Sequence, residues 1–223
     1  IWDVDTDALR LIAPYGVGGK FSPDGEWLAY LTFGQAKLDE NANPIDTPLV
    51  GKSIYMQLMN VSSQQVTLSL PAIARPDYDD VNFDKHQFLQ ALFSSDSRYL
   101  AFLTPGEIQL DDNYWPVSVI TETAQAQINV LDLQEKRLPW SAPGSEKSGL
   151  SWSPNGRFLA YQDSSDNWQL FDLFRQRVIP VTLYNGAAVS SPDWSYDGEY
   201  LSFMSYQEAG WITYIFDMAL QAE

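Results

Sequence analysis

Trp152-Ser153-Pro154-Asn155-Gly156-Arg157-Phe158-Leu159-Ala160-Tyr161 is one of four copies of a single phrase in this 223-residue chain. The other copies begin at Phe21, Phe93 and Trp194 and read FSPDGEWLAY, FSSDSRYLAF and WSYDGEYLSF. Each copy joins two apolar segments through a short run rich in Ser, Pro, Asn, Asp and Gly, the residue types that favour tight turns. The chain is therefore expected to contain four hairpins of one kind.

A second signature follows each copy. After the third copy it consists of the apolar run 168–173 and then the run 177–182. The phrase and this signature together supply four short strands in about 40 residues, which is typical of a β-propeller blade. The equivalent third strands are Ile54 to Asn60, Ile128 to Asp132 and Ile212 to Asp217. We expect the Asn or Asp that ends each of these strands to accept hydrogen bonds from the backbone of the next turn.

The combination of aromatic-Ser-Pro-Asp-Gly, an apolar strand and Ile-Tyr-x-x-Asp resembles the TolB-like (WD-repeat-like) β-propeller repeat. The resemblance covers most of the chain outside its long connections. It implies binding or scaffolding rather than catalysis, and a periplasmic or otherwise exported protein. The second copy departs from the motif, with Ser95 in place of Pro and Ser97 in place of Gly, so its turn is expected to differ.

The repeat predicts an all-β chain that forms a single β-propeller domain, 1–223, of four-stranded antiparallel blades. Segment 1–13 supplies the last two strands of a preceding blade, and the successive blades are 17–70, 88–140, 149–183 and 190–219. The last blade has three strands, so the two ends of the chain do not complete each other. We expect an open arc or part of a larger propeller, whose exposed edges further blades or a partner would cover. The alternative is a closed ring in which Ile1 to Asp5 pairs with Trp211 to Asp217.

Composition excludes several classes of partner. Lys and Arg number 13 against 29 Asp and Glu, a formal charge of −16 that repels nucleic acid. The chain has no cysteine and therefore neither disulfides nor thiolate metal sites. An uninterrupted apolar run long enough to cross a membrane is missing, so membrane insertion is not expected.

Three long excursions interrupt the repeat: Phe33 to Lys52, Pro71 to Gln90 and Pro105 to Gln127. In an up-and-down blade these connections emerge on one face, so we expect all three to lie on the same rim. Long loops of this kind commonly carry function. Their acids and aromatics suggest a partner-binding surface, for which the candidates are Asp77, Tyr78, Asp79, Asp80, Asp111, Asp112, Tyr114 and Trp115. In the alternative interpretation the acids only solvate the loops and the aromatics tuck beneath them.

Motifs for catalysis are missing. His86 is the only histidine, and no Gly-x-Ser-x-Gly elbow occurs. The acids show no established spacing for calcium ligands, so neither a metal nor a cofactor is predicted. The leading hypothesis is a non-enzymatic module that binds another protein. The alternative is the gating propeller of a prolyl-oligopeptidase-type serine peptidase with its catalytic domain outside this chain. A glycan-binding or glycan-cleaving propeller would rest on Trp115 and the acids.

Overall fold

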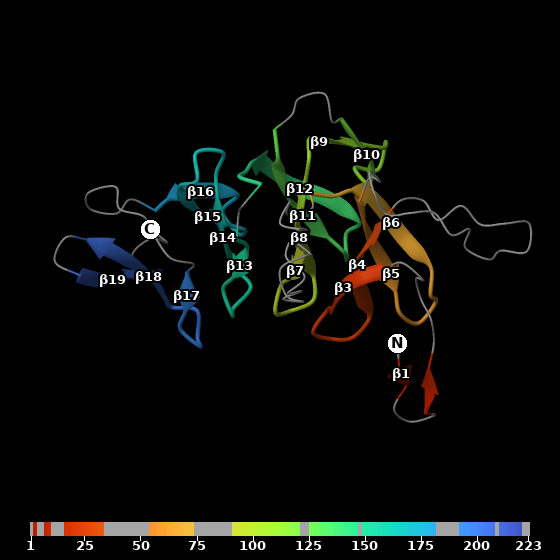
Figure 1. The fold of residues 1–223 in the computed structure, drawn as a ribbon, viewed down its shortest axis with the longest axis horizontal. Coiled ribbons are helices and arrows are strands. Elements are labelled where there is room, and N and C mark those ends of the chain that lie inside the picture. Colours follow the sequence, from red (N-terminus) through yellow and green to blue (C-terminus); the bar gives the residue numbers. More distant parts are fainter. Residues whose placement is uncertain are drawn as a thin grey trace, which may run out of the picture.

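The four repeats form successive antiparallel sheets in the computed structural model (Figure 1). The structure describes residues 2–3, 7–9, 16–33, 54–73, 91–120, 125–146, 149–181, 192–207 and 210–219, and these contain strands and turns but no helix. A short hairpin of β1 (Trp2–Asp3) and β2 (Ala8–Leu9) precedes the first sheet.

The sheet formed by each of the four repeats is referred to below as a blade. Blade 1 consists of β3 (Gly16–Phe21), β4 (Trp27–Phe33), β5 (Ile54–Asn60) and β6 (Val66–Pro71). Blade 2 consists of β7 (Ala91–Phe93), β8 (Tyr99–Thr104), β11 (Gln127–Asp132) and β12 (Arg137–Pro143). Blade 3 consists of β13 (Ser151–Trp152), β14 (Phe158–Gln162), β15 (Trp168–Asp172) and β16 (Arg177–Pro180). Blade 4 has three described strands, β17 (Asp193–Trp194), β18 (Tyr200–Gln207) and β19 (Gly210–Asp217). Among the described residues, the sheets in chain order have two, four, four, four and three strands, and a further two-stranded sheet is inserted between β8 and β11.

The repeated phrase forms the turn between the first two strands of each blade. In blade 3 the Ser153 hydroxyl donates to Asn155 Oδ1 at 2.7 Å and accepts from the backbone N–H of Phe158 at 2.9 Å. Asn155 Oδ1 also accepts from the N–H of Arg157 at 3.1 Å. Gly156 has φ +70°, a left-handed conformation that glycine adopts without a steric penalty. The serine therefore links the two strands, and the Asn holds the bend.

The other three copies make the same turn, through the pairs Ser22–Asp24, Ser94–Asp96 and Ser195–Asp197. The expectation that the second copy would differ is wrong. Ser97 takes the left-handed conformation of the missing glycine, with φ 62°. Its hydroxyl accepts a hydrogen bond at 2.9 Å from the backbone N–H of Asp24 in blade 1. This contact between the blades compensates for the strained backbone.

Substitution of Ser97 should separate these two effects. Ser97→Ala keeps the left-handed strain and removes the acceptor of the Asp24 amide, so it should lower the free energy of unfolding by about 1 kcal/mol. Ser97→Gly removes the same acceptor but also relieves strain of roughly 1 kcal/mol, so its net effect should be near zero. Urea denaturation of both variants measures the difference. Equal losses would contradict the proposed compensation.

Acidic or amide side chains end the third strand of every blade, as predicted. Asn60, Asp132, Asp172 and Asp217 each accept a hydrogen bond from a backbone N–H two or three residues later. Their role as turn caps is confirmed. In blades 2 and 3 the capping carboxylate also pairs with an arginine from the repeated turn, Arg98 with Asp132 and Arg157 with Asp172.

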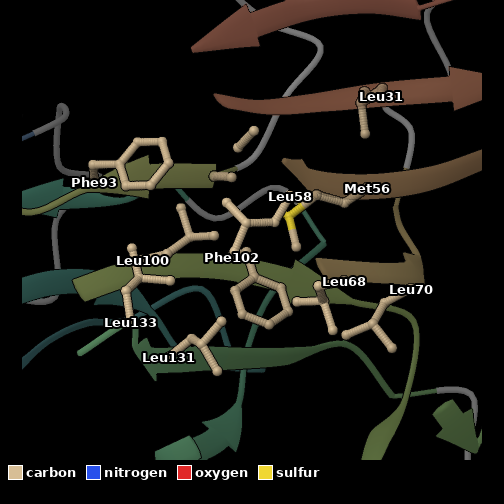
Figure 2. Packing of buried hydrophobic residues seen from close by; sticks show 12 residues of the cluster. Leu31, Met56, Leu58, Leu68, Leu70, Phe93, Leu100, Phe102, Leu131 and Leu133 are labelled. Carbon is tan, nitrogen blue, oxygen red and sulfur yellow. The ribbon is translucent and has the colours of Figure 1, made fainter. Parts of the chain in front are cut away.

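The hydrophobic core lies between successive blades. Figure 2 shows the first cluster, where Leu31, Met56, Leu58, Leu68 and Leu70 of blade 1 meet Phe93, Leu100, Phe102, Leu131 and Leu133 of blade 2. A second cluster joins blades 2 and 3, with Trp140 stacked on Phe171 at 4.1 Å between ring centroids. A third joins blades 3 and 4. Two tryptophans of the repeats, Trp152 and Trp168, are buried in the second and third clusters.

The blades follow one another along an open arc (Figure 1). The inner strands β3, β7, β13 and β17 lie on the concave side, and the β1–β2 hairpin and blade 4 lie at opposite ends of the arc. Among the described strands, β1 pairs only with β2 and β19 only with β18. This arrangement agrees with the expected open arc, and no sheet closes it into a ring in the described part of the chain.

Candidate protein-interaction surface

The structure describes half of the predicted site residues. Asp77, Tyr78, Asp79 and Asp80 lie outside the described residues, as do His86 and most of the first two excursions. Asp111, Asp112, Tyr114 and Trp115 are described, and all four lie at the tip of a β-hairpin between β8 and β11. The third excursion is therefore the part of the candidate surface that the structure defines.

This excursion contains two strands that the sequence analysis treated as loop. β9 (Glu107–Leu110) and β10 (Pro116–Ile120) pair in antiparallel fashion, with a bulge between Pro116 and Ser118. The signal was the alternation of apolar residues, Ile108 and Leu110 on one side of the turn and Val117 and Val119 on the other. We refer to β9, β10 and the turn 111–115 as the perimeter hairpin.

Asp111 holds the turn of the perimeter hairpin. Its Oδ1 accepts hydrogen bonds from the backbone N–H groups of Asn113 at 2.8 Å and Trp115 at 2.9 Å. Tyr114 occupies the left-handed region with φ 63°. Asp163 makes the equivalent two bonds in the 163–167 turn of blade 3. The carboxylate of Asp111 therefore has a structural role of its own, separate from any partner.

One face of the perimeter hairpin packs on the propeller. Ile108, Trp115 and Val119 are partly buried against the cluster between blades 1 and 2. The carbonyl of Tyr114 accepts a hydrogen bond at 3.1 Å from the N–H of Leu138 in β12. Figure 1 shows the hairpin at the outer perimeter, beside the outermost strands β6 and β12. Trp115 therefore agrees with the alternative interpretation, in which the aromatic side chains lie beneath the loop. Its ring packs inward and does not form an open stacking platform.

The hairpin also exposes apolar and acidic groups to solvent. Tyr114 is 66 % exposed, Val117 54 % and Leu110 38 %. Asp112 and Glu107 are exposed next to them. We refer to these five residues as the outer hairpin surface. Sequence reasoning identified Asp112 and Tyr114 but missed Leu110 and Val117, whose exposure depends on how the hairpin packs against the blades.

The carboxyl groups with lowered pKa values in the described part of the chain lie in turns of the propeller. The hydroxyl of Ser22 lowers the pKa of Asp24, and the hydroxyl of Ser195 does the same for Asp197. Burial alone would raise the pKa of Asp163, but hydrogen bonds from the backbone of Asn167 and Ser165 outweigh it and lower the value. These carboxylates are engaged in turn hydrogen bonds, so their shifts indicate structure and not acid–base catalysis.

Within the described ranges, no group of three or more His, Asp and Glu side chains is arranged to hold a metal ion. The same residues contain no helix with the length and apolar character needed to cross a bilayer.

The fold can be compared with known proteins. No family model and no curated protein matches the chain. The propeller domain of the Trilobed protease from Pyrococcus furiosus, described as having an open velcro topology, is similar with a TM-score of 0.54 and 16 % identity over 91 % of this chain and 54 % of that chain. The Swd1 β-propeller domain from Myceliophteria thermophila is similar with a TM-score of 0.52 and 13 % identity, over 96 % of this chain and 55 % of that chain.

TolB from Acinetobacter baumannii is also similar, with a TM-score of 0.50 and 14 % identity over 92 % of this chain and 41 % of that chain. The chain therefore spans about half the length of these solved structures. At such low identity the likeness concerns the fold alone. The architecture is that of a β-propeller of the TolB-like and WD-like kind, as the repeated phrase predicted.

Proposed function

We propose that this chain is a non-enzymatic propeller module that binds another protein through the outer hairpin surface. The main supporting observation is the exposure of Leu110, Tyr114 and Val117 on a hairpin that is anchored to the first two blades through other side chains. Exposed aromatic and aliphatic side chains on a rigid support lose little conformational entropy on binding and are typical of interface centres.

Charge defines the kind of partner. The apolar residues are flanked by the carboxylates of Glu107 and Asp112, on a chain with a net charge of −16. The complementary surface is an apolar patch bordered by Lys or Arg. Such a partner would associate faster at low salt, because exposed charges are screened at higher ionic strength. Asp77, Tyr78, Asp79 and Asp80 remain proposed extensions of this surface, and a periplasmic or exported location remains part of the proposal.

The test is a substitution of the outer hairpin surface that spares its fold. The triple variant Asp112→Lys, Tyr114→Asn and Val117→Lys leaves the turn cap Asp111 and the packed Trp115 in place. Asn suits position 114 because it tolerates the left-handed backbone. The expected result is at least a tenfold weaker capture of the partner by the variant bait in native cells, which corresponds to about 1.4 kcal/mol.

A matched control lies on blade 3. Phe174 is 77 % exposed in the turn 173–176, so Phe174→Ser changes a comparable exposed ring away from the hairpin. This variant should capture the partner as the wild type does, and circular dichroism should show all three proteins folded. Equal capture by the triple variant and the wild type would remove the outer hairpin surface from the proposal.

A second candidate is the gating propeller of a serine peptidase. It is favoured by the similarity to the propeller domain of the Trilobed protease. In this case a hydrolase domain with a Gly-x-Ser-x-Gly elbow would lie outside these residues. The reading frame of the complete gene distinguishes the two proposals, because only the peptidase requires that elbow together with its Asp and His.

A further inference from the structure

A second exposed apolar surface lies on blade 4, at the other end of the arc from blade 1. The register of β18 and β19 places Tyr206 opposite Trp211 and Ser202 opposite Ile215, all on one face of the sheet. On this face Ile215 is 70 % exposed, Trp211 69 % and Tyr206 62 %. Met204 and Tyr200 are 48 % and 45 % exposed beside them. We refer to these five residues as the end face.

In the other three blades the equivalent face of the sheet is buried. Ile215 pairs across the sheet with Ser202, and the same place in the register is held by Leu58 opposite Ala29, Val130 opposite Ala101 and Leu170 opposite Ala160. The side chains of Leu58 and Val130 are 0 % exposed and that of Leu170 is 1 % exposed. In each of these cases the following blade covers the face.

The covering groups can be identified from the contact between blades 3 and 4. Phe158 of blade 3 is 1 % exposed and is stacked near Trp194 of the following blade, with ring centroids 6.3 Å apart. Tyr200 is the equivalent of Phe158 in the repeated phrase and is 45 % exposed. An aromatic side chain at the start of another repeat would be placed to pack on Tyr200 in the same way.

A second copy of this chain cannot repeat the blade-to-blade contact in head-to-tail fashion. The surface of blade 1 that would have to meet the end face carries Leu28, Tyr30 and Met59. These side chains are already buried, at 7 %, 6 % and 2 % exposed. This surface therefore offers the end face little exposed apolar area, and the end face requires a different occupant.

Charge specifies this occupant further. In blades 2 and 3 the residue after the turn is an arginine, and it pairs with the capping carboxylate of Asp132 or Asp172. In blade 4 the equivalent residue is Glu199, which is adjacent to Asp217 through a backbone hydrogen bond to Met218. The turn end of the end face is therefore acidic where those of blades 2 and 3 are balanced, although blade 1 also has a glutamate, Glu26, at this place. A complementary surface would carry Lys or Arg there.

We propose that the end face is the docking site of a further β-propeller blade of the same repeat. That blade presents an apolar sheet face with an aromatic residue before its Ser-x-Asp-Gly turn, and basic residues at the turn end. The docking continues the three blade-to-blade interfaces already present in the arc. The solved propellers of similar fold are about twice as long as this chain, which leaves room for such blades. This proposal is independent of the outer hairpin surface.

The experiment is site-specific photo-crosslinking in the organism's own cells. The photoreactive amino acid p-benzoylphenylalanine replaces Tyr206, an exposed aromatic position where another ring is tolerated. It also replaces Phe174 in a control, because that side chain is exposed but lies outside the end face. Mass spectrometry then identifies the peptides joined to each position. The expected product at position 206 is a peptide with an aromatic-Ser-x-Asp-Gly turn that is not part of this 223-residue sequence.

A disrupting variant completes the test. Ile215→Lys places a charge at the centre of the end face and should reduce crosslinking at position 206 at least tenfold, with no change in the thermal midpoint of the arc itself. Three results would overturn the proposal: crosslinks to residues 1–223 of a second copy, crosslinks to a protein without the repeat, or a yield at position 206 no higher than at position 174.

Discussion

Replacement of Leu170 by alanine should lower the free energy of unfolding by about 3 kcal/mol, whereas Ile215→Ala should change it by less than about 0.5 kcal/mol. The two residues hold equivalent positions in blades 3 and 4. Leu170 is 1 % exposed in the cluster with Leu201 and Phe203, so its truncation loses transfer energy and leaves a cavity. Ile215 is 70 % exposed and has little burial to lose. Urea denaturation followed by tryptophan fluorescence measures both.

The two variants serve as controls for each other, because Leu170 and Ile215 hold equivalent register positions and their truncation to alanine removes a side chain of similar size. Light scattering must show the same oligomeric state for both proteins and the wild type, since association would bury Ile215. A loss on Ile215→Ala as large as that on Leu170→Ala would show that the end face is covered even in the isolated chain. It would thus contradict the exposed end of the arc.

Replacement of Arg157 by methionine should cost about 3 kcal/mol of unfolding free energy at neutral pH. Arg157 Nη2 lies 2.8 Å from Asp172 Oδ2, and the Asp172 side chain is 0 % exposed, so the variant leaves a buried carboxylate without its cation. Methionine retains an apolar stem of similar length against Phe158. The exposed Arg175 provides the control, since Arg175→Met should change the stability by less than about 0.5 kcal/mol.

The effect of Arg157→Met should depend on pH. Burial alone would raise the pKa of Asp172, but the hydrogen bond from Arg157 and those from the backbone of Arg175 and Phe174 outweigh it, so the pKa is lowered. The resulting stability is present above the unfolded carboxyl pKa, near 4, and is lost as the pH falls through the lower folded value. The difference between wild type and variant should therefore shrink below about pH 4. A constant difference would show that Arg157 acts through packing and not through charge.

The architecture was predictable because one local phrase specifies it repeatedly. Ser153 and Asn155 satisfy the backbone of their own turn, and the Asp172 cap does the same one hairpin later, so these patterns depend only on near neighbours in sequence. The turn at Ser97 was predicted wrongly because the group that stabilises its strained backbone, the N–H of Asp24, belongs to another blade. A contact between residues far apart in sequence cannot be predicted from a local motif.

The candidate surface was only partly predictable, for a related reason. Acids and aromatics mark the third excursion, but their separate roles depend on which face of the perimeter hairpin packs inward. Trp115 packs toward the core, Asp111 holds the turn, and Tyr114 points to solvent although it lies between them in sequence. In the sequence, exposed end-face residues such as Ile215 cannot be distinguished from buried strand residues. Their exposure becomes apparent only in comparison with the covered blades.

The packing between neighbouring blades also bears on how such a chain changes over evolutionary time. Three of the four described core clusters join one blade to the next in sequence, the fourth lies within blade 1, and none joins blade 1 to blade 4. The energy of such an array is approximately a sum of single-unit and nearest-neighbour contributions. Duplication of a gene segment that encodes one blade therefore adds one unit and one interface, and it leaves the existing interfaces intact. Blade number in an open arc of this kind can thus grow or shrink in single steps, each of which is stable enough to be inherited.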